Sequence, residues 1–320
     1  MKIFNSLTKK KETFIPRVHK KIDLYVCGMT VYDDIHIGHA RTFINFDAII
    51  KFLRFAGWEV NYIRNITDID DKIIEAAREA KISALDLSRK YINEMHKDFD
   101  SLGMMRPNKE PKVSDHINEI IEMIKTLENK GYAYSKEDSD VYFDVIKFKE
   151  YGKLSNRTLN QIESAERIDI DLNKNHEADF VLWKKDTLGI TWPSPWGQGR
   201  PGWHIECSAM SMKYLGEEFD IHGGGLDLKF PHHENEIAQS RCATNKNFAS
   251  YWMHTGPLRI NDKKMSKSLK NFLTVKDVLK NFHPEVLRLF FLLTHYRSPI
   301  SYSEEGLRKA KIILDKFYNL

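Results

Sequence analysis

Residues 25–40 read YVCGMTVYDDIHIGHA, and this stretch decides the fold expected for the 320-residue chain. Ile22, Leu24 and Val26 alternate with polar residues, which predicts a strand, and a helical pattern begins at His36. A strand that leads through a loop into a helix presents unpaired backbone N–H groups and the positive end of the helix dipole to a phosphate. We therefore predict a nucleotide-binding site where this strand ends.

Two histidines in this stretch, His36 and His39, flank Gly38. Their imidazoles can donate hydrogen bonds to an anion, and the glycine leaves room for a flat base or a ribose. Taken alone, such a pair more often lies on the surface or packs in a core. Far downstream, residues 264–268 read KMSKS, which brings two ammonium groups to a polyphosphate and strengthens the nucleotide interpretation.

The composition describes a globular chain, since 42% of its residues are apolar and 29% are charged. No membrane span is apparent, and the first ten residues lack the apolar core of a signal peptide, so we expect a cytoplasmic protein. Three cysteines do not form a disulfide framework and are expected to be ligands or buried thiols. The net charge of +4 permits a nucleic-acid partner without requiring one.

A second strand is predicted beyond the first helix. Residues 41–55 carry apolar side chains at helical spacing, Gly57 ends the run, and residues 60–66 form the next strand. A strand, a helix and a strand predict two parallel strands with a right-handed crossover. Cys27 and Thr67 then fall at the edge of the sheet where ligands bind.

Residues 65–72, which read NITDIDDK, place three carboxylates within four positions. A metal site is conceivable, but we favour helix N-capping.

Further helices are predicted from Ser83 and over residues 114–130. Between residues 132 and 200 the pattern changes: Val141, Phe143 and Val145 alternate as a strand, and residues 192–197 are rich in proline. We interpret this region as an insertion between two halves of a nucleotide-binding sheet.

Two downstream segments, residues 202–208 (GWHIECS) and residues 230–236 (FPHHENE), carry potential metal ligands. Pro231 suits the first position of a helix, which places His232 and Glu236 one turn apart on the same face. His233 is also compatible with Glu236, so the spacing leaves the choice open. The donor types are those that zinc accepts in tetrahedral sites, although no CxxC pair is present: Cys27, Cys207, one of the two histidines, and Glu236.

These motifs together resemble the cysteinyl-tRNA synthetases of class I. The resemblance rests on residues 27–33 (CGMTVYD), 36–39 (HIGH), 202–210 (GWHIECSAM), 230–240 (FPHHENEIAQS) and 264–268 (KMSKS), and it extends through nearly the whole chain. Leu226 and Lys270 depart from the residues usual in the family. The family continues into a helical domain that reads the anticodon, so we expect this sequence, which stops at Leu320, to represent a shortened form with weakened tRNA charging.

The resemblance implies an α/β fold with a Rossmann-like parallel sheet, an inserted connective subdomain and a mostly helical C-terminal segment. The expected parts are the first half of the catalytic domain (1–115), the connective insertion (116–200), the second half of the catalytic domain (201–255), and the KMSKS loop with a helical stem-contact segment (256–320).

The resemblance also implies one Zn²⁺ per chain, held by Cys27, Cys207, His232 and Glu236, with His233 left out. Cys242 matches no ligand and is expected to be a structural thiol. Serine differs from cysteine only in oxygen for sulfur, and zinc prefers the soft thiolate. Such a metal would let the enzyme select cysteine without an editing domain.

The implied reaction is activation of L-cysteine by ATP with Mg²⁺, followed by transfer to tRNA(Cys), in a monomer. Residues expected to act in catalysis are His36, His39, Lys264 and Lys267. Residues expected at ATP are Thr30, His36, Gly38, His39, Gly223, Gly224, Gly225, Asp227, Lys264, Ser266, Lys267 and Ser268. Residues expected at the amino acid are Gly28, Thr30, Thr67 and Trp203, and Trp203 could equally pack in the core.

Two alternatives remain at this point. A cysteine ligase with the same catalytic core could pass the activated cysteine to an amino-sugar, as mycothiol synthesis requires. A zinc-stabilised RNA-binding module without catalysis is the alternative from another class. The intact histidines and lysines of the two signatures argue against the module, because a protein without catalysis would be free to lose them.

Overall fold

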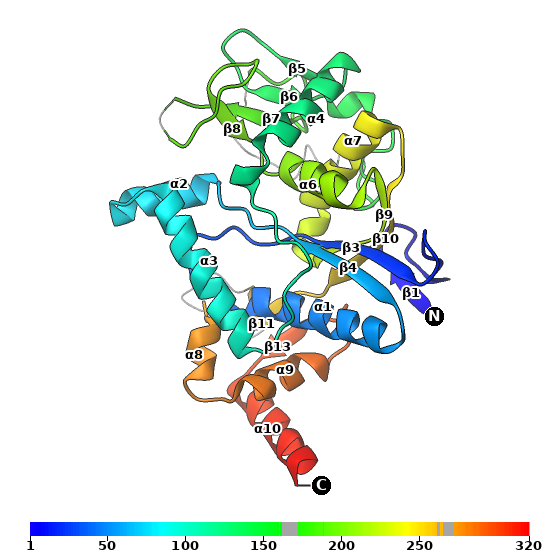
Figure 1. Ribbon diagram of the computed structural model, residues 1–320, viewed down its shortest axis with the longest axis vertical. Helices are drawn as coiled ribbons and strands as arrows, with labels where there is room; N and C mark the ends of the chain where they lie inside the picture. Colours follow the sequence, from blue (N-terminus) through cyan, green and yellow to red (C-terminus); the bar gives the residue numbers. More distant parts are fainter. Residues whose placement is uncertain (160, 162–171, 188, 261–262, 265–271, 320) are drawn as a thin grey trace.

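The structure is a computed structural model that describes residues 1–159, 161, 172–187, 189–260, 263–264 and 272–319. Its centre is a parallel sheet in the order β10-β9-β3-β4 (Figure 1). The bounds of these strands are Lys21–Val26 for β3, Glu59–Arg64 for β4, Glu218–Gly225 for β9 and Phe248–Thr255 for β10. Strands from two distant parts of the chain thus form one sheet.

The crossover between β3 and β4 is α1 (Ile37–Phe55). Its apolar side chains pack against the sheet because they repeat at helical spacing, and Phe46 and Ile50 are fully buried. The helix ends before Gly57, whose φ of +85° is a left-handed conformation that glycine adopts without strain. The predicted strand–helix–strand unit with parallel strands is confirmed.

Three helices follow β4 along the chain: α2 (Asp71–Ala80), α3 (Ala84–Ser101) and α4 (Ile117–Asn129). Asp70 caps α2 by accepting a hydrogen bond from the Lys72 N–H at 2.9 Å. Ser83 caps α3 in the same way, through the Asp86 N–H. N-capping therefore accounts for Asp70 in the acidic run, as we predicted.

A separate antiparallel sheet contains β5 (Ala133–Ser135), β6 (Val141–Phe143), β7 (Phe180–Lys185) and β8 (Gly199–Pro201), in that order (Figure 1). The prediction that the strand of β6 continues through Val145 was wrong. The Val145 N–H donates to the buried carboxylate of Asp179 at 2.9 Å, and the chain turns into a 3₁₀ helix at Val145–Lys147. A contact that is distant in sequence ends this strand.

The second half of the central sheet carries α6 (Ile205–Leu215) and α7 (His232–Thr244). A 3₁₀ turn at Leu226–Lys229 follows β9. The structure corrects the position of Pro231, which caps α7, so that the helix begins one residue later than predicted. His232 and Glu236 remain one turn apart in α7.

The described residues of the C-terminal part form a small sheet and three helices, below the central sheet in Figure 1. Its elements are β11 (Leu258–Ile260), β12 (Lys263–Lys264), α8 (Val275–Leu279), α9 (Pro284–Leu292), β13 (Ile300–Tyr302) and α10 (Glu304–Tyr318). An N-terminal hairpin of β1 (Lys2–Asn5) and β2 (Lys10–Thr13) contacts β10.

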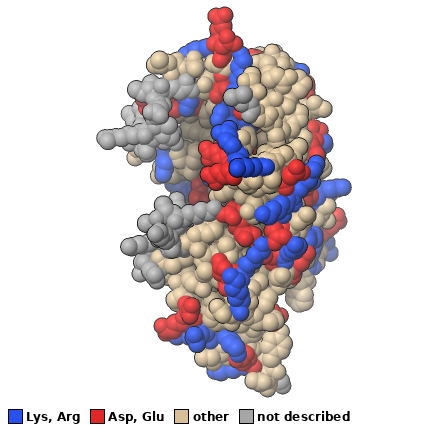
Figure 2. Space-filling view, turned by 90° about the vertical axis from the view of Figure 1, so that its left-hand side faces the viewer, with Lys and Arg blue, Asp and Glu red and all other residues tan. Residues whose placement is uncertain are grey.

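The surface that Figure 2 presents has acidic and basic side chains intermixed. The visible face therefore carries no large field of a single sign. Among the helices of the described ranges, none has the length and apolarity that a membrane crossing requires.

Candidate active site

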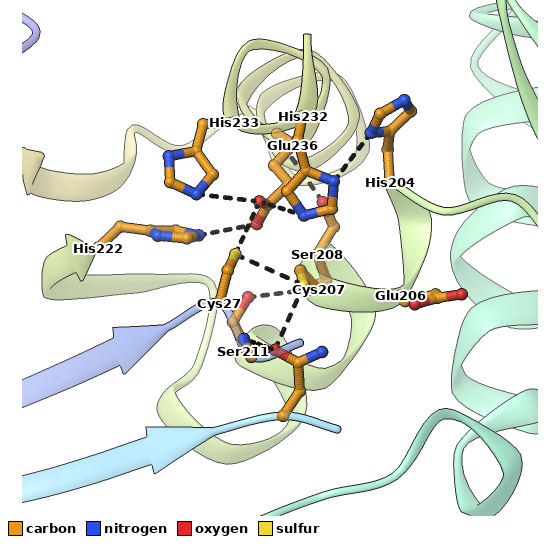
Figure 3. A network of polar contacts seen from close by, with 12 residues as sticks. Cys27, His204, Glu206, Cys207, Ser208, Ser211, His222, His232, His233 and Glu236 are labelled. Carbon is orange, nitrogen blue, oxygen red and sulfur yellow. Dashed lines mark hydrogen bonds and ion pairs between the residues drawn. The ribbon is translucent and has the colours of Figure 1, made fainter. Parts of the chain in front are cut away.

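Four potential metal ligands converge at the carboxyl edge of the central sheet (Figure 3). Cys27 directly follows β3, Cys207 lies in α6, and His232 and Glu236 lie in α7. One donor atom from each side chain lies within 4.8 Å of the others, and all four residues are buried. Folding thus assembles residues that are about 200 positions apart in sequence.

The distances within this set fit a tetrahedral zinc site. The two Sγ atoms are 3.6 Å apart, Cys27 Sγ is 3.3 Å from Glu236 Oε1, and that oxygen is 3.1 Å from His232 Nε2. Bonds of about 2.0–2.3 Å to zinc give tetrahedron edges of about 3.3–3.8 Å, so these three distances match the edges to within about 0.2 Å. Two sulfurs, one nitrogen and one oxygen also make a donor set that zinc accepts.

The electrostatics of the set favour one ionised thiol. Burial opposes ionisation of Cys207, but hydrogen bonds with Cys27 and His232 and the charge of His232 outweigh it and lower the pKa of this thiol to about 6. Burial and the neighbouring Cys207 raise the pKa of Cys27. Although burial opposes the charged form, the pKa of His232 is raised to about 10 by the Glu236 carboxylate. Cys207 therefore ionises readily in this dry environment, whereas His232 holds a proton that a metal ion must displace.

A second histidine group surrounds the same carboxylate. His222 Nε2 lies 2.8 Å from Glu236 Oε2, and its ring stacks on Trp252 with centroids 4.4 Å apart. His233 Nε2 is 4.0 Å from Glu236 Oε1, so His222 and His233 form an alternative set with Cys27 and Glu236. The geometry thus admits both histidines of α7, although His232 is closer.

Sequence reasoning missed His222, whose Nε2 lies within hydrogen-bond distance of Glu236 Oε2. The available signal was its position in a buried strand directly before three glycines, a place where an apolar residue is the ordinary choice.

Cys242 lies in α7 among apolar side chains, and burial raises the pKa of its thiol to about 12. That environment agrees with the predicted structural role.

The candidates for the amino-acid pocket lie beside Cys27. Thr67 is buried, its backbone bridges Thr30 in parallel, and its hydroxyl donates to Glu206 Oε2 at 3.0 Å. Asn65 Oδ1 accepts from the Gly28 N–H at 2.8 Å and lies 3.6 Å from Cys207 Sγ. Asn65 therefore joins the end of β3 to the cysteine of α6, a role that its sequence position did not reveal.

Trp203 lies outside the core, with 40% of its surface exposed. Its ring centroid is 4.6 Å from that of His232 and 5.1 Å from that of His204. The alternative that Trp203 packs in the core was therefore wrong. The indole instead borders the ligand cluster, where it can contact a bound molecule.

The first signature opens α1. His36 caps the helix, and its Nδ1 accepts a hydrogen bond from the His39 N–H at 3.1 Å. The two rings stack with centroids 3.5 Å apart, and Gly38 occupies the first turn. Burial, with smaller effects from His36 and Lys72, lowers the pKa of His39 well below its ordinary value. His39 is thus a neutral imidazole at the N-terminus of a helix at physiological pH.

The three glycines at the end of β9 pack closely against protein groups. An added Cβ would lie 2.3 Å from the Phe46 ring at Gly223, 2.9 Å from the His233 ring at Gly224, and 2.3 Å from Asp227 Oδ1 at Gly225. The buried rings therefore favour glycine at Gly223 and Gly224 independently of any nucleotide, whereas at Gly225 the Asp227 side chain can rotate away. The predicted contact of these glycines with ATP is a separate matter and stays a prediction.

The second signature is only partly described. Lys264 ends β12, whose backbone pairs with β11, while Ser266, Lys267 and Ser268 lie outside the described residues. The chain beyond the signature returns to the first signature, since Thr274 forms a backbone bridge with His36. The segment that follows the second signature is thus adjacent in space to the first signature.

Comparison with known proteins decides the family. Residues 13–312 match the family described as the catalytic domain of class I (C) tRNA synthetases. The cysteine–tRNA ligase of Shewanella sp. (strain MR-4) is 55% identical over 319 residues, which cover 99% of this chain and 69% of that protein. The chain belongs to the cysteinyl-tRNA synthetase family. The predicted resemblance and enzyme class are therefore confirmed.

Other comparisons agree with membership of the cysteinyl-tRNA synthetases. The cysteine–tRNA ligase of Pseudoalteromonas translucida (strain TAC 125) is also 55% identical, over 317 residues that cover 99% of this chain and 69% of that protein. Among solved structures, methionyl-tRNA synthetase from Mycobacterium tuberculosis in complex with methionyl-adenylate superposes with a TM-score of 0.70 at 14% identity, covering 90% of this chain and 67% of that one. That similarity confirms the class I synthetase fold of this family member.

Proposed function

We propose that the chain activates L-cysteine with ATP to form cysteinyl-adenylate and transfers the cysteinyl group to tRNA(Cys), with one Zn²⁺ selecting the substrate thiolate. The observation that carries this proposal is the buried cluster of two thiols, an imidazole and a carboxylate at the carboxyl edge of the sheet. The relatives named cysteine–tRNA ligase support the choice of amino acid and of tRNA.

The zinc would be held by Cys27, Cys207, His232 and Glu236, whose distances fit its coordination. When bound, zinc supplies a soft Lewis acid that lowers the pKa of a substrate thiol and binds sulfur in preference to the hydroxyl of serine. A pocket that recognises shape alone separates such near-isosteres by only about 1–3 kcal/mol. Trp203 is 40% exposed and its ring lies 4.6 Å from that of the buried His232, so we place the approach of the substrate on this side of the cluster.

The chemical step needs no covalent nucleophile from the protein. The carboxylate of cysteine attacks the α-phosphate of ATP, which arrives with Mg²⁺, and pyrophosphate leaves, so the protein orients the reactants and stabilises charge. His39, neutral and at a helix N-terminus, can donate an N–H to a phosphate oxygen together with His36. Lys264 and Lys267 are proposed to stabilise the pyrophosphate, on sequence grounds.

The remaining site assignments are proposals of the same kind. At ATP we place Thr30, Gly38, Gly223, Gly224, Gly225, Asp227, Ser266 and Ser268. At the amino acid we place Gly28, Thr30, Thr67 and Trp203. The monomeric state, the cytoplasmic location and the division into four parts stay predictions from the sequence.

The decisive test is exchange of labelled pyrophosphate into ATP by the purified chain. We expect exchange with cysteine, about 100-fold less or none with serine, and loss of exchange after zinc is removed by a chelator, with recovery when zinc is returned. A folded, zinc-loaded chain that shows no cysteine-dependent exchange would contradict the proposal. Transfer of labelled cysteine to a tRNA(Cys) transcript, with an amino-sugar as the competing acceptor, then identifies the acceptor.

A further inference from the structure

Three elements meet at the ammonium group of Lys276, the second residue of α8. Its Nζ lies 2.6 Å from Asp34 Oδ1, in the loop after β3, and 2.6 Å from Glu94 Oε2, on α3. The two carboxylate side chains are 32% and 24% exposed, so both are partly shielded from water. Lys276 therefore ties the loop of the first signature to α3 from a helix that follows the second signature.

Backbone hydrogen bonds also hold the loop after β3 against residues 273–275, where α8 begins. The Val275 N–H donates to the Ile35 carbonyl at 2.8 Å, and the Ile37 N–H donates to the Leu273 carbonyl at 3.0 Å. His36 thus lies between two backbone bonds. Asp34 is two residues upstream and is held by the side chain of Lys276. A shift of Asp34 would therefore displace the loop next to His36.

The position of His36 determines that of the second imidazole. Its Nδ1 accepts from the His39 N–H at 3.1 Å, and the rings stack at 3.5 Å. A displacement of the loop is consequently passed to both side chains, because one ring caps the helix that carries the other. The contacts thus run from the ion pair of Lys276 and Asp34 to His36, and from His36 to His39.

We propose that Lys276 is a positioning residue for the first signature, whose ammonium group anchors Asp34 against α3 and so fixes His36 and His39 for reaction. This inference rests on the proposed function, in which the two imidazoles act on the phosphates of ATP. It assigns to a residue outside both signatures a role in the chemical step and none in binding ATP.

A positioning role and a merely stabilising role predict different results. Partly exposed ion pairs contribute little to folding stability. In contrast, a displacement of reacting groups by about 1 Å can lower a rate about 100-fold. Loss of the Lys276 ammonium group should therefore affect turnover far more than it affects thermal unfolding or the binding of substrates.

The test compares Lys276→Met with Lys276→Arg and with Lys280→Met. Lys280 is a matched control because it lies one helical turn after Lys276, at the C-terminal cap of α8. It pairs with Asp277 and is 71% exposed. In pyrophosphate exchange, Lys276→Met should lower kcat about 10- to 100-fold with KM for ATP and cysteine changed less than about threefold. Lys276→Arg should restore most of kcat, and Lys280→Met should match the unmodified chain.

A double-mutant cycle with Asp34→Asn examines the contact itself. If Lys276 acts through Asp34, the double variant should be no slower than the slower single variant, whereas independent effects would multiply. Multiplying effects, or a kcat for Lys276→Met within twofold of Lys280→Met, would overturn the proposal. So would a loss of activity in Lys276→Met that is matched by a lower Tm and is not rescued by Lys276→Arg.

Hydrogen exchange separates this inference from the proposed function. Amides at the start of α1, residues 37–40, should exchange faster in Lys276→Met than in Lys280→Met, whether or not the chain catalyses exchange of pyrophosphate. Unchanged protection of these amides would contradict the positioning role. A chain without cysteine-dependent exchange but with this change in protection would instead contradict the proposed function alone.

Discussion

At the scale of single residues, the candidate metal site depends on which side chains surround Glu236. Its Oε1 faces Cys27 and His232, while His222 holds Oε2 at 2.8 Å. An outer imidazole of this kind fixes the orientation of a ligating carboxylate. Both histidines of α7 reach the same carboxylate, so only substitution separates the two donor sets.

We expect His232→Asn to lose its zinc during dialysis, because it removes a direct ligand, and His233→Asn to keep about one zinc per chain. His222→Asn should retain zinc with about 10- to 100-fold lower affinity, because it removes the support of the carboxylate. Zinc content measured by elemental analysis, with circular dichroism as the control for folding, checks all three. Loss of zinc from His233→Asn and its retention by His232→Asn would favour the other donor set.

Asp98 on α3 gives a prediction for pH. It is 4% exposed, its Oδ2 has no hydrogen-bond partner within the described chain, and burial raises its pKa to about 6. The folded chain keeps this proton to about pH 6, whereas the unfolded chain loses it near pH 4, so the stabilisation is present below about pH 4 and is lost as pH rises through 6.

Asp98→Asn, which cannot ionise, should therefore be more stable than the unmodified chain at pH 8 by about 2–3 kcal/mol, by roughly half of that at pH 5, and nearly equal to it at about pH 3.5. Urea unfolding of both proteins at about pH 3.5, 5 and 8 measures the difference. A difference that does not change with pH would show that Asp98 ionises normally in the folded chain.

At the scale of elements, the close approach of β3 and β4 beyond their ends sets the position of Cys27. A Cβ on Gly28 would lie 1.7 Å from the carbonyl oxygen of Asn65, and 2.7 Å from its carbon. The obstacle is backbone, which cannot rotate away as a side chain can. Glycine at this position thus keeps the carboxyl edge of the sheet closed next to the ligand cluster.

Gly28→Ala should lower the free energy of unfolding by about 3 kcal/mol or more, since strand ends must separate to admit the methyl group. Gly57→Ala is the control, because it has φ of +85° but no atom within 4 Å of the added Cβ, and it should cost about 1 kcal/mol. Urea unfolding measures both. Equal effects would mean that the strand ends separate easily.

At the scale of the whole molecule, a buried guanidinium joins the central sheet to the C-terminal part. Arg41 on α1 is 1% exposed; its Nη1 donates to the Pro257 carbonyl at 2.5 Å, and its Nη2 donates to the Ser298 carbonyl. Gly256 permits the same approach, because an added Cβ would lie 2.4 Å from the Ser298 carbonyl oxygen. These contacts connect the first signature helix to the sheet that carries Lys264.

Arg41→Met should loosen this connection, because it removes the guanidinium donors of the Pro257 and Ser298 carbonyls, and a hydrogen bond with a charged group contributes about 1.5–3 kcal/mol. We expect protection of the amides of β11 and β13 from hydrogen exchange to fall by about 30-fold or more, with smaller changes in β3 and β9. Arg259→Met, at an exposed position of β11, serves as the control. Equal loss of protection throughout the molecule would contradict a local uncoupling.

Much of the fold was predictable from local pattern. Period-two and helical spacing located β3, α1 and β4, and the capping residues Asp70 and Ser83 began their helices where side-chain chemistry predicts. The strand predicted through Val145 failed because Asp179, which is distant in sequence, captures its N–H. Local propensity cannot include such a contact.

The sequence by itself determined the family, the parallel unit around residues 25–40, and the residues that are candidates for the four donors, because motifs and periodicity are written along the chain. Only the tertiary structure decided that His222 shares Glu236, that Trp203 lies outside the core, and that Lys276 reaches Asp34. These facts depend on distances between residues far apart in sequence. Such distances arise only when the parallel strands bring separate segments to one edge of the sheet.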